Sequence, residues 1–384
     1  MANTLTAILP TIYEAADIVS RELVGFIPAV YRNSRAARAA VNQSVTYPIT
    51  PAMTSANITA SNTLPAGTDQ TIASDSITIT KSKGVSWPWT GEEQIALSIG
   101  DVPQGSNILR DQFAQAMRTL VNEIESDIFT AAYKGASRAY GTAGTAPFGT
   151  ASDLSDFAGV LRILDDNGAP TSDRHLVVGA AAMANLRGKQ SVLFKVNEAG
   201  TSDFLRRGIL GEVMGLMIHN SYPITAITKG TGASYLVNNA SNYAVGATTI
   251  AADTGSGTIL QGDIVTFAGD SNKYVVGTAL SAGSLALNGP GLLAALADNT
   301  AITVGNNYTP NVAFDRNAIH LVTRAPAMPA GGDAADDVQD VTDPTSGLTF
   351  QVAVYRERRQ VVYEVGAAWG VKVVAPRHVA TLIG

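Results

Sequence analysis

The chain has 384 residues, of which 46% are hydrophobic and only 15% are charged, and its formal net charge is −6. This length suffices for two or three domains, and the composition excludes a disordered chain. Without clustered Lys and Arg we expect no sequence-reading contacts to nucleic acid, and without Cys the disulfides, thiolate metal sites and Cys nucleophiles are excluded.

The sequence also lacks targeting and membrane signals. Residues 1–17 do not combine a basic region with a continuous apolar core, so they do not read as a secretory signal. No window approaches the roughly 18 uninterrupted apolar residues of a membrane span. We therefore expect a protein that is made and folds in a cytoplasm.

Residues 1–43 begin with a short amphipathic helix, because Ile12, Ala16 and Val19 recur at helical spacing. Three arginines at intervals of three residues follow this helix. They could meet phosphates or an acidic partner, but a solvated face or salt bridges to a neighbouring chain is the favoured interpretation. These arginines are Arg32, Arg35 and Arg38.

Residues 44–95 are dominated by Ser, Thr, Ala and Pro, and strand-like pieces flank a long polar stretch. Alternation from Ile77 to Val85, through Lys81 and Lys83, predicts a hairpin arm. An arm so poor in large apolar residues cannot bury a core of its own, so it needs a surface to lie on. Trp87 and Trp89 lie two residues apart and face one side of a strand; we expect them to anchor the base of the hairpin, with a binding platform as the alternative.

Residues 104–134 form the longest helical run, with an apolar stripe from Leu109 to Ala131. Asp111, Arg118 and Glu125 are expected on its opposite, polar side. A core helix of a large domain and a rod that stiffens a thin, extended subunit are both consistent with such a length.

A mixed α/β segment follows the helix. It contains a helix over Leu154–Asp166, a buried strand over His175–Gly179 and a short helix over Ala180–Leu186. Phe204–Leu210 and Glu212–Asn220 then resemble a helix or turn followed by a strand.

Residues 229–309 resemble an inserted β-barrel or sandwich, because turn-rich stretches separate short strand candidates. We expect the chain to return from this module at Asn311–Thr323. The strand candidates are Tyr235–Val237, Thr248–Ile250, Asp263–Phe267, Lys273–Val276 and Ala301–Val304.

The C-terminal part begins with an acidic segment, 331–344, which is expected to be a flexible loop. Its acid spacing does not match an EF-hand. Leu348–Val374 predicts two long strands that meet at Arg358–Gln360, and the tail adds one more apolar strand.

A search for chemistry finds no catalytic, cofactor or metal constellation. The four histidines are far apart in sequence and lie in or beside apolar strands, where satisfied core or edge histidines are expected. Gly188–Ser191 lacks the glycine and the spacing of a phosphate loop. We therefore expect no enzyme, no cofactor and no metal site. The histidines are His175, His219, His320 and His378.

The order of these parts resembles the major capsid proteins of tailed bacteriophages with the Hong Kong 97 fold. It is especially similar to the coat proteins of short-tailed Salmonella phages, which carry an inserted domain. The resemblance implies an α+β fold with an N-terminal arm, an E-loop hairpin, a spine helix, a peripheral (P) domain and an axial (A) domain. The segments that carry it are NILRDQFAQAMRTLVNEIESDIF, TGASYLVNNASNY through QGDIVTFAGD, NVAFDRNAIHLVT and AAWGVKVVAPRHVATLIG.

The resemblance divides the chain at positions of this sequence. The expected parts are the N-terminal arm 1–43, the E-loop hairpin 44–95, the P-domain 96–149 with its spine helix 104–134, the first part of the A-domain 150–228, the inserted β-domain 229–309, the A-domain return 310–330 and the P-domain closing loop and strands 331–384.

The resemblance implies a major capsid protein of the virion, made in the host bacterial cytoplasm. Its implied partners are other copies in hexamers and pentamers, a separate scaffolding protein, a portal protein, a possible decoration protein and packaged double-stranded DNA bound without sequence specificity; no membrane is expected. Some relatives link a Lys to an Asn covalently, but no partner Asn is identified here for either hairpin lysine. Candidate contacts between subunits are Lys81, Lys83, Trp87, Trp89, Arg32, Arg35 and Arg38.

Two other classes are consistent with parts of the sequence. A tail-tube or surface-layer subunit would also be β-rich and polymeric, but it does not readily explain a long helix between a hairpin and an α/β core. A hydrolase with an accessory β-module at 229–309 would need a pair of carboxylates on facing elements, and the acidic segment 331–344 is its single candidate.

Overall fold

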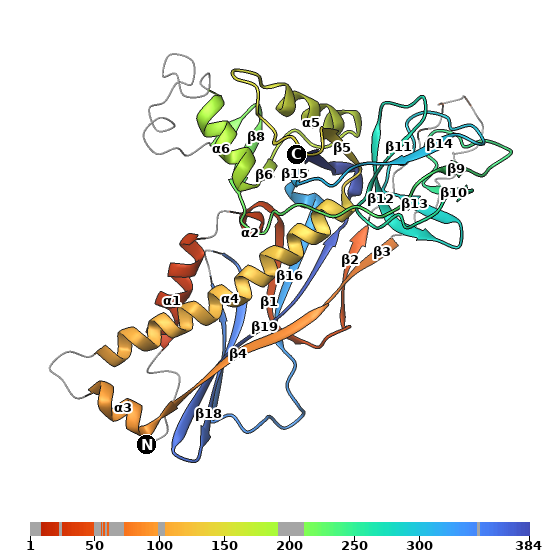
Figure 1. Cartoon of the computed structure of the whole chain (residues 1–384). Coiled ribbons are helices and arrows are strands. Elements are labelled where there is room, and N and C mark those ends of the chain that lie inside the picture. The colour runs from red at the N-terminus through yellow and green to blue at the C-terminus, as the bar shows by residue number, and fades with distance from the viewer. Residues whose placement is uncertain are drawn as a thin grey trace.

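The computed structural model shows an elongated molecule with a narrow lower half and a broad upper half (Figure 1). The described residues are 9–22, 25–49, 73–98, 104–190, 211–343 and 346–384, together with residues 55, 57 and 60.

Helix α4 (Gln104–Gly135) runs diagonally through the molecule and joins its two halves (Figure 1). Its 32 residues span about 48 Å at 1.5 Å per residue. The apolar stripe is buried from Phe113 to Ile128 and packs against α1 (Leu9–Glu22) and β19 (Gln360–Val373). The predicted helix and its contact with the closing strands are confirmed. Two shorter helices also contact it: α2 (Phe26–Ala29) and α3 (Gly91–Ser98).

The lower half holds a sheet that we call the spine sheet. Among the described residues it has six strands, and β19 pairs with three of them, β16, β18 and β4. The predicted long closing strands, which meet near Arg358–Gln360, are confirmed as β18 and β19. The strands are β1 (Tyr31–Ala39), β4 (Lys81–Thr90), β16 (Ile319–Pro326), β17 (Asp337–Thr342), β18 (Thr349–Glu357) and β19.

Strand β17 corrects the prediction of a flexible acidic loop at 331–344. It pairs antiparallel with β18 at the edge of the spine sheet. Val341 is buried and pairs with Phe350, so this apolar side chain attaches to the sheet a strand that carries two acidic residues, Asp337 and Asp340. Acidic side chains at a sheet edge also discourage edge-to-edge pairing.

A separate hairpin leaves the lower half, formed by β2 (Ser44–Ile49) and β3 (Ala73–Thr78). The alternation from Ile77 to Val85, expected to form one arm, is divided between two sheets. Up to Thr78 it belongs to this hairpin, and from Lys81 it belongs to β4 in the spine sheet. Ile79 and Thr80 make the crossing, where Thr80 N donates to Trp369 O.

The upper half is built on a second sheet, which we call the long sheet, with twelve strands among the described residues. Helices α5 (Ser155–Asp166) and α6 (Ala180–Lys189) pack on one face of it. In order across the sheet the strands are β11 (Ile264–Phe267), β14 (Ala301–Val304), β9 (Tyr235–Val237), β10 (Thr249–Asp253), β13 (Ser284–Leu287), β12 (Lys273–Ser281), β5 (Arg138–Gly141), β20 (Val379–Ile383), β15 (Pro310–Asp315), β6 (Arg174–Val178), β8 (Leu216–Asn220) and β7 (Glu212–Val213).

The inserted module is a closed barrel, because β11 pairs with both β14 and β12 and thereby joins the two ends of its strand order. The barrel has its own core, in which Val237, Val265 and Tyr274 are buried. The predicted strands Tyr235–Val237 and Ala301–Val304 have the same bounds in the structure, whereas β13 was not predicted. Residues 204–210, expected as a helix or turn, lie outside the described residues.

The segment Asn311–Thr323, predicted as one return from the barrel, is divided between the two sheets. The chain forms β15 in the long sheet, turns through a short 3-10 helix (Arg316–Ala318) and enters the spine sheet as β16. A second 3-10 helix (Pro376–His378) makes the same crossing in reverse, between β19 and β20. In β15, Val312 packs in the core with α4, whereas Ala313 packs in the core with α5 and α6. The long sheet therefore separates two cores.

Candidate assembly surfaces

The β2–β3 hairpin is tied to the spine sheet by a polar cluster at its base. Tyr47 donates to Asp75 (Oη to Oδ2, 2.6 Å), and the Lys372 ammonium contacts Asp75 Oδ1 at 2.5 Å and Ser76 O at 3.0 Å. The hydrogen bonds from Lys372 and Tyr47 lower the pKa of Asp75 to about 2. Because both partners stabilise the carboxylate form, Asp75 holds hairpin and sheet together at neutral pH.

Apolar contacts complete this base. Ile77 and Ile79 are buried against Val322 of β16 and Ala368 of β19. Strands β2 and β3 pair with each other and with no other described strand. An isolated two-stranded hairpin is at best marginally stable in water, so this pair of strands is suited to lie on another surface.

Lys81 and Lys83 project from β4 toward acidic residues of α4. Lys81 Nζ lies 3.0 Å from Glu123 Oε1 and 2.8 Å from Asp127 Oδ1, and Lys83 Nζ lies 2.5 Å from Glu123 Oε1. Trp369 Nε1 donates to the other oxygen of Asp127 at 2.8 Å. The two lysines therefore join β4, α4 and β19 within one subunit, and their contact with a neighbouring subunit stays a prediction.

The two tryptophans also face α4. The Trp87 ring packs edge-on against Phe113 with centroids 5.0 Å apart, and Trp89 Nε1 donates to Gln112 at 2.6 Å. They attach β4, the strand that follows the hairpin, to the spine helix. This packing agrees better with the expected anchoring role than with a binding platform, which would leave the rings free. A contact between subunits through these residues stays a prediction.

The arginine series lies on β1. Arg32 donates to Ser346 O, and burial lowers the pKa of its guanidinium. Arg38 is exposed and reaches Asp340 of the acidic strand at 3.6 Å. The side chain of Arg35 lies outside the described residues. Arg32 and Arg38 thus have partners within the chain, and contacts to a neighbouring subunit stay a prediction for all three.

Glu125 corrects the expected polar face of α4, because its side chain is 6% exposed instead of facing solvent. Its carboxylate accepts hydrogen bonds from Phe26 N at 2.5 Å, Ile27 N at 2.9 Å and Ser221 Oγ at 2.7 Å. Burial raises its pKa, and these bonds oppose that rise. Asp111 stays exposed and Arg118 pairs with Glu22, as expected of a polar face.

Two histidines far apart in sequence meet because β6 and β8 pair in parallel. His175 Nδ1 lies 3.0 Å from His219 Nε2, and His175 Nε2 lies 2.9 Å from Asp173 Oδ1. Arg316 also contacts the His175 ring. The prediction of satisfied core or edge histidines is confirmed for this pair, although the pairing itself depends on strand register and was not foreseen.

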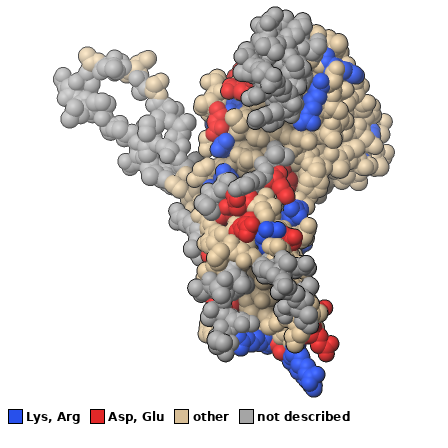
Figure 2. Space-filling model, turned by 90° about the vertical axis from the view of Figure 1, so that its left-hand side faces the viewer, with Lys and Arg blue, Asp and Glu red and all other residues tan. Residues whose placement is uncertain are grey.

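Over the described ranges, no three acidic, His or Cys side chains form a group that could hold a metal ion. No helix in that same part of the chain is long and apolar enough to cross a membrane. The face in Figure 2 carries few charged side chains, with both signs intermixed, as the low charged fraction leads one to expect.

Several solved structures are similar to the chain in fold. A structure of Mycobacterium phage Che8 is 12% identical, covers 94% of this chain and 91% of its own, and has a TM-score of 0.45. The capsid structure of Cyanophage P-SCSP1u is 12% identical, with coverages of 94% and 88% and a TM-score of 0.49. A virus-like particle from Pyrococcus furiosus is 9% identical, with coverages of 97% and 98% and a TM-score of 0.44. No curated protein sequence matches the chain.

The sequence match to a protein family is more specific. The family model described as P22 coat protein, gene protein 5, matches residues 30–263, more than half of the chain. The match includes the hairpin, α4 and the first strands of the inserted barrel. The chain therefore belongs to the P22 coat protein family, and the protein is a structural capsid protein of a phage virion and not an enzyme.

Proposed function

We propose that copies of this coat protein assemble as hexamers and pentamers into an icosahedral shell. In this proposal a separate scaffolding protein directs the assembly of a procapsid that includes a portal protein. The procapsid then expands as double-stranded DNA is packed without sequence-specific contacts. Family membership and the β2–β3 hairpin support the proposal.

The β2–β3 hairpin is the structural feature that most directly supports self-assembly. Its base is fixed by Asp75 and Lys372, whereas its two strands are extended by no other described strand. Unpaired strand edges and exposed backbone groups favour contact with another chain. A closed symmetric shell supplies that chain for every copy, so the proposed role of residues 44–95 is an E-loop that lies over a neighbouring subunit.

The other parts receive roles on the same basis. Residues 1–43 form the N-terminal arm, 96–149 and 331–384 the P-domain, 150–228 the A-domain and 229–309 the inserted domain. Sheet membership supports assigning β15 to the A-domain and β16 to the P-domain, which divides the return segment between them. The intermixed charges and net charge of −6 suit a shell that encloses DNA without trapping its phosphates.

Electron microscopy of the expressed protein tests the proposal. With a co-expressed scaffolding protein, we expect closed icosahedral particles in negative stain. Expression without the scaffold serves as the comparison and should give fewer or irregular particles. Monomers or open tubes under both conditions would contradict the shell.

Replacing residues 50–72 with a short Gly-Ser turn tests the hairpin. Because β2, β3 and the Asp75 cluster are retained, we expect a folded monomer with an unchanged circular dichroism spectrum. Particle yield should fall at least tenfold, since the arm can no longer cover a neighbour. A misfolded monomer would show instead that the segment belongs to the core of the subunit.

A further inference from the structure

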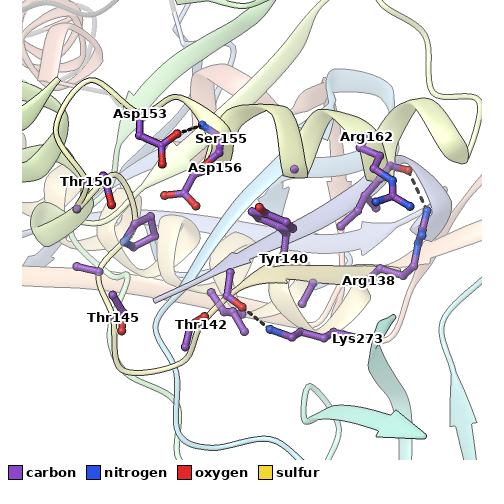
Figure 3. A pocket seen from close by; sticks show the side chains of 18 of the residues that line it. Arg138, Tyr140, Thr142, Thr145, Thr150, Asp153, Ser155, Asp156, Arg162 and Lys273 are labelled. Carbon is purple, nitrogen blue, oxygen red and sulfur yellow. Dashed lines mark hydrogen bonds between the residues drawn. The ribbon is translucent and has the colours of Figure 1, made fainter. Parts of the chain in front are cut away.

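A polar groove of about 980 Å³ lies in the upper half, outside the surfaces described above. Helix α5 forms one wall, and the loop that follows β5 forms the other (Figure 3). Lys273, the first residue of β12, and the two residues before it, Ser271 and Asn272, close one end. The groove therefore lies where the inserted module meets the rest of the long sheet.

Positive charge is in excess at the barrel end of the groove. Arg138, Arg162 and Lys273 gather there (Figure 3), and Asp166 is the carboxylate that pairs with the two arginines, at 3.3 Å from Arg138 and 3.7 Å from Arg162. Lys273 Nζ donates to Gly141 O and forms no ion pair within the described residues. Burial lowers the pKa of Lys273, which is the effect expected of a cation without a counter-ion.

The Arg138 guanidinium is buried beneath this end of the groove, where its terminal nitrogens donate to Asn272, Asn167, Asp166 and the Ile163 carbonyl. The Arg138 side chain is 4% exposed, and its Nε is buried without a partner among the described residues. Arg138 therefore contributes positive charge from beneath the groove, whereas the exposed Arg162 and the half-buried Lys273 are the cations that an occupant can reach.

The other end of the groove carries two carboxylates and one cation, Lys189. Asp153 and Asp156 lie at the start of α5 (Figure 3), and each uses one oxygen to accept a backbone N–H, from Ser155 and from Phe148. Tyr140 lies between the two ends. Its ring packs so closely under Gly159 that a Cβ at that position would overlap it. The barrel end thus sets three cations against one carboxylate, and the other end sets two carboxylates against Lys189, so the two ends differ in the sign of their net charge.

The charge pattern selects among occupants. A nucleic-acid strand carries uniform negative charge, so Asp153 and Asp156 would repel it. A peptide segment with an acidic side chain at one end and a basic or neutral group at the other matches both ends. In a shell the neighbouring chains are copies of this one, and each copy carries six more acidic than basic residues, 32 against 26.

We propose that this groove binds an extended segment of a second copy of the chain, with an Asp or Glu carboxylate placed against Arg162 and Lys273. The inference rests on the proposed self-assembly. It goes beyond it by naming a contact outside the hairpin and the residues that select the partner.

The lack of Cys in the chain allows a direct test with one introduced thiol. Thr142 is exposed and lines the groove near Lys273, so Thr142→Cys places the thiol at the contact. Its rate of reaction with a small maleimide is measured in purified monomers and in assembled shells. We expect labelling to be at least tenfold slower in shells.

Charge variants at the rim of the groove test the carboxylate contact itself. The Arg162 side chain is 79% exposed, so its substitution does not threaten the fold. Combined with Thr142→Cys, Arg162→Glu should bring the labelling rate in shells back toward the monomer rate, whereas Arg162→Lys should keep the protection. Protection that is unchanged by Arg162→Glu would overturn the carboxylate contact.

The remaining outcomes separate this inference from the proposed function. Shells in which the thiol reacts as fast as in monomers would overturn the groove contact and leave self-assembly standing. Failure of the unmodified chain to form shells under any condition would contradict the proposed self-assembly and this inference with it.

Discussion

The carboxylate of Glu125 joins three parts of the chain that lie far apart in sequence. It is on α4, it accepts the backbone N–H groups of Phe26 and Ile27 at the start of α2, and it accepts the Ser221 hydroxyl just after β8. Close packing at Gly25 completes the junction, because a Cβ at that position would overlap the carboxylate. The residue therefore fixes the N-terminal arm and the upper half against the spine helix.

Glu125→Ala tests this junction. The substitution leaves two backbone donors and one hydroxyl without an acceptor in a buried site, so we expect a loss of about 3 kcal/mol in the free energy of unfolding. Urea denaturation of the monomer measures it. Gln115→Ala, at an exposed position of the same helix, is the matched control and should change stability by less than about 0.5 kcal/mol. Equal, small effects of both variants would show that the junction contributes nothing.

Among the elements, the hairpin and the spine sheet are joined by a carboxylate that contacts both of them. Asp75 of β3 contacts Lys372 of β19 and Tyr47 of β2, so the same carboxylate closes the hairpin and attaches it to the spine sheet. The lowered pKa of Asp75 means that its ionised carboxylate is more stable in the folded state than in the unfolded state. The contribution to stability is present above the ordinary pKa of 3.8 and is lost as the pH falls toward 2.

Asp75→Asn tests the anchor and its pH dependence. The shift in pKa corresponds to somewhat over 2 kcal/mol, but the side chain is 33% exposed and solvent screening reduces this to about 1 kcal/mol at pH 7. The difference in stability between wild type and variant should shrink between pH 4 and pH 2 (roughly the window set by the two pKa values), because the wild-type carboxylate becomes protonated there. Amide hydrogen exchange of β2 and β3, measured in both proteins at each pH, reports this difference in stability. A difference that stays constant with pH would contradict the ion pair.

At the scale of the whole molecule, the inserted barrel holds the upper end of the spine helix. Asn288 donates to Lys134 O at 2.8 Å and Ala136 O at 2.7 Å, and so satisfies carbonyls that the end of a helix leaves unpaired. Strand β12 pairs with β5, so the barrel is continuous with the long sheet. The barrel nevertheless has a separate core, which predicts that it can fold by itself.

Expression of residues 229–309 alone tests this independence. We expect a β-type circular dichroism spectrum and a cooperative thermal transition, because the closed barrel retains its core. Ile302→Ala should destabilise the fragment by about 3 kcal/mol through the cavity it leaves in that core. An unfolded wild-type fragment would show that pairing with β5 is required, and the module boundary would then be wrong.

Elements whose signal is local can be predicted from the amino-acid sequence. The apolar stripe of α4, the closing strands and the barrel strands Tyr235–Val237 and Ala301–Val304 follow from periodicity and turn residues within a few positions. The tryptophans are expected to anchor the base of the hairpin, and in the structure they attach β4, the strand after the hairpin, to α4. The order of the parts was enough to indicate the family that the sequence match then showed.

Contacts between residues far apart in sequence depend on how the elements pack and pair. The acidic strand β17 forms because β18 offers it an edge, and Ile77–Val85 divides because two different sheets accept its halves. Glu125 is buried because α2 and Ser221 bring donors to it. The groove exists because β12 lies beside β5. Burial, charge pairing and register depend on contacts between residues far apart in sequence, and periodicity along one segment does not record them.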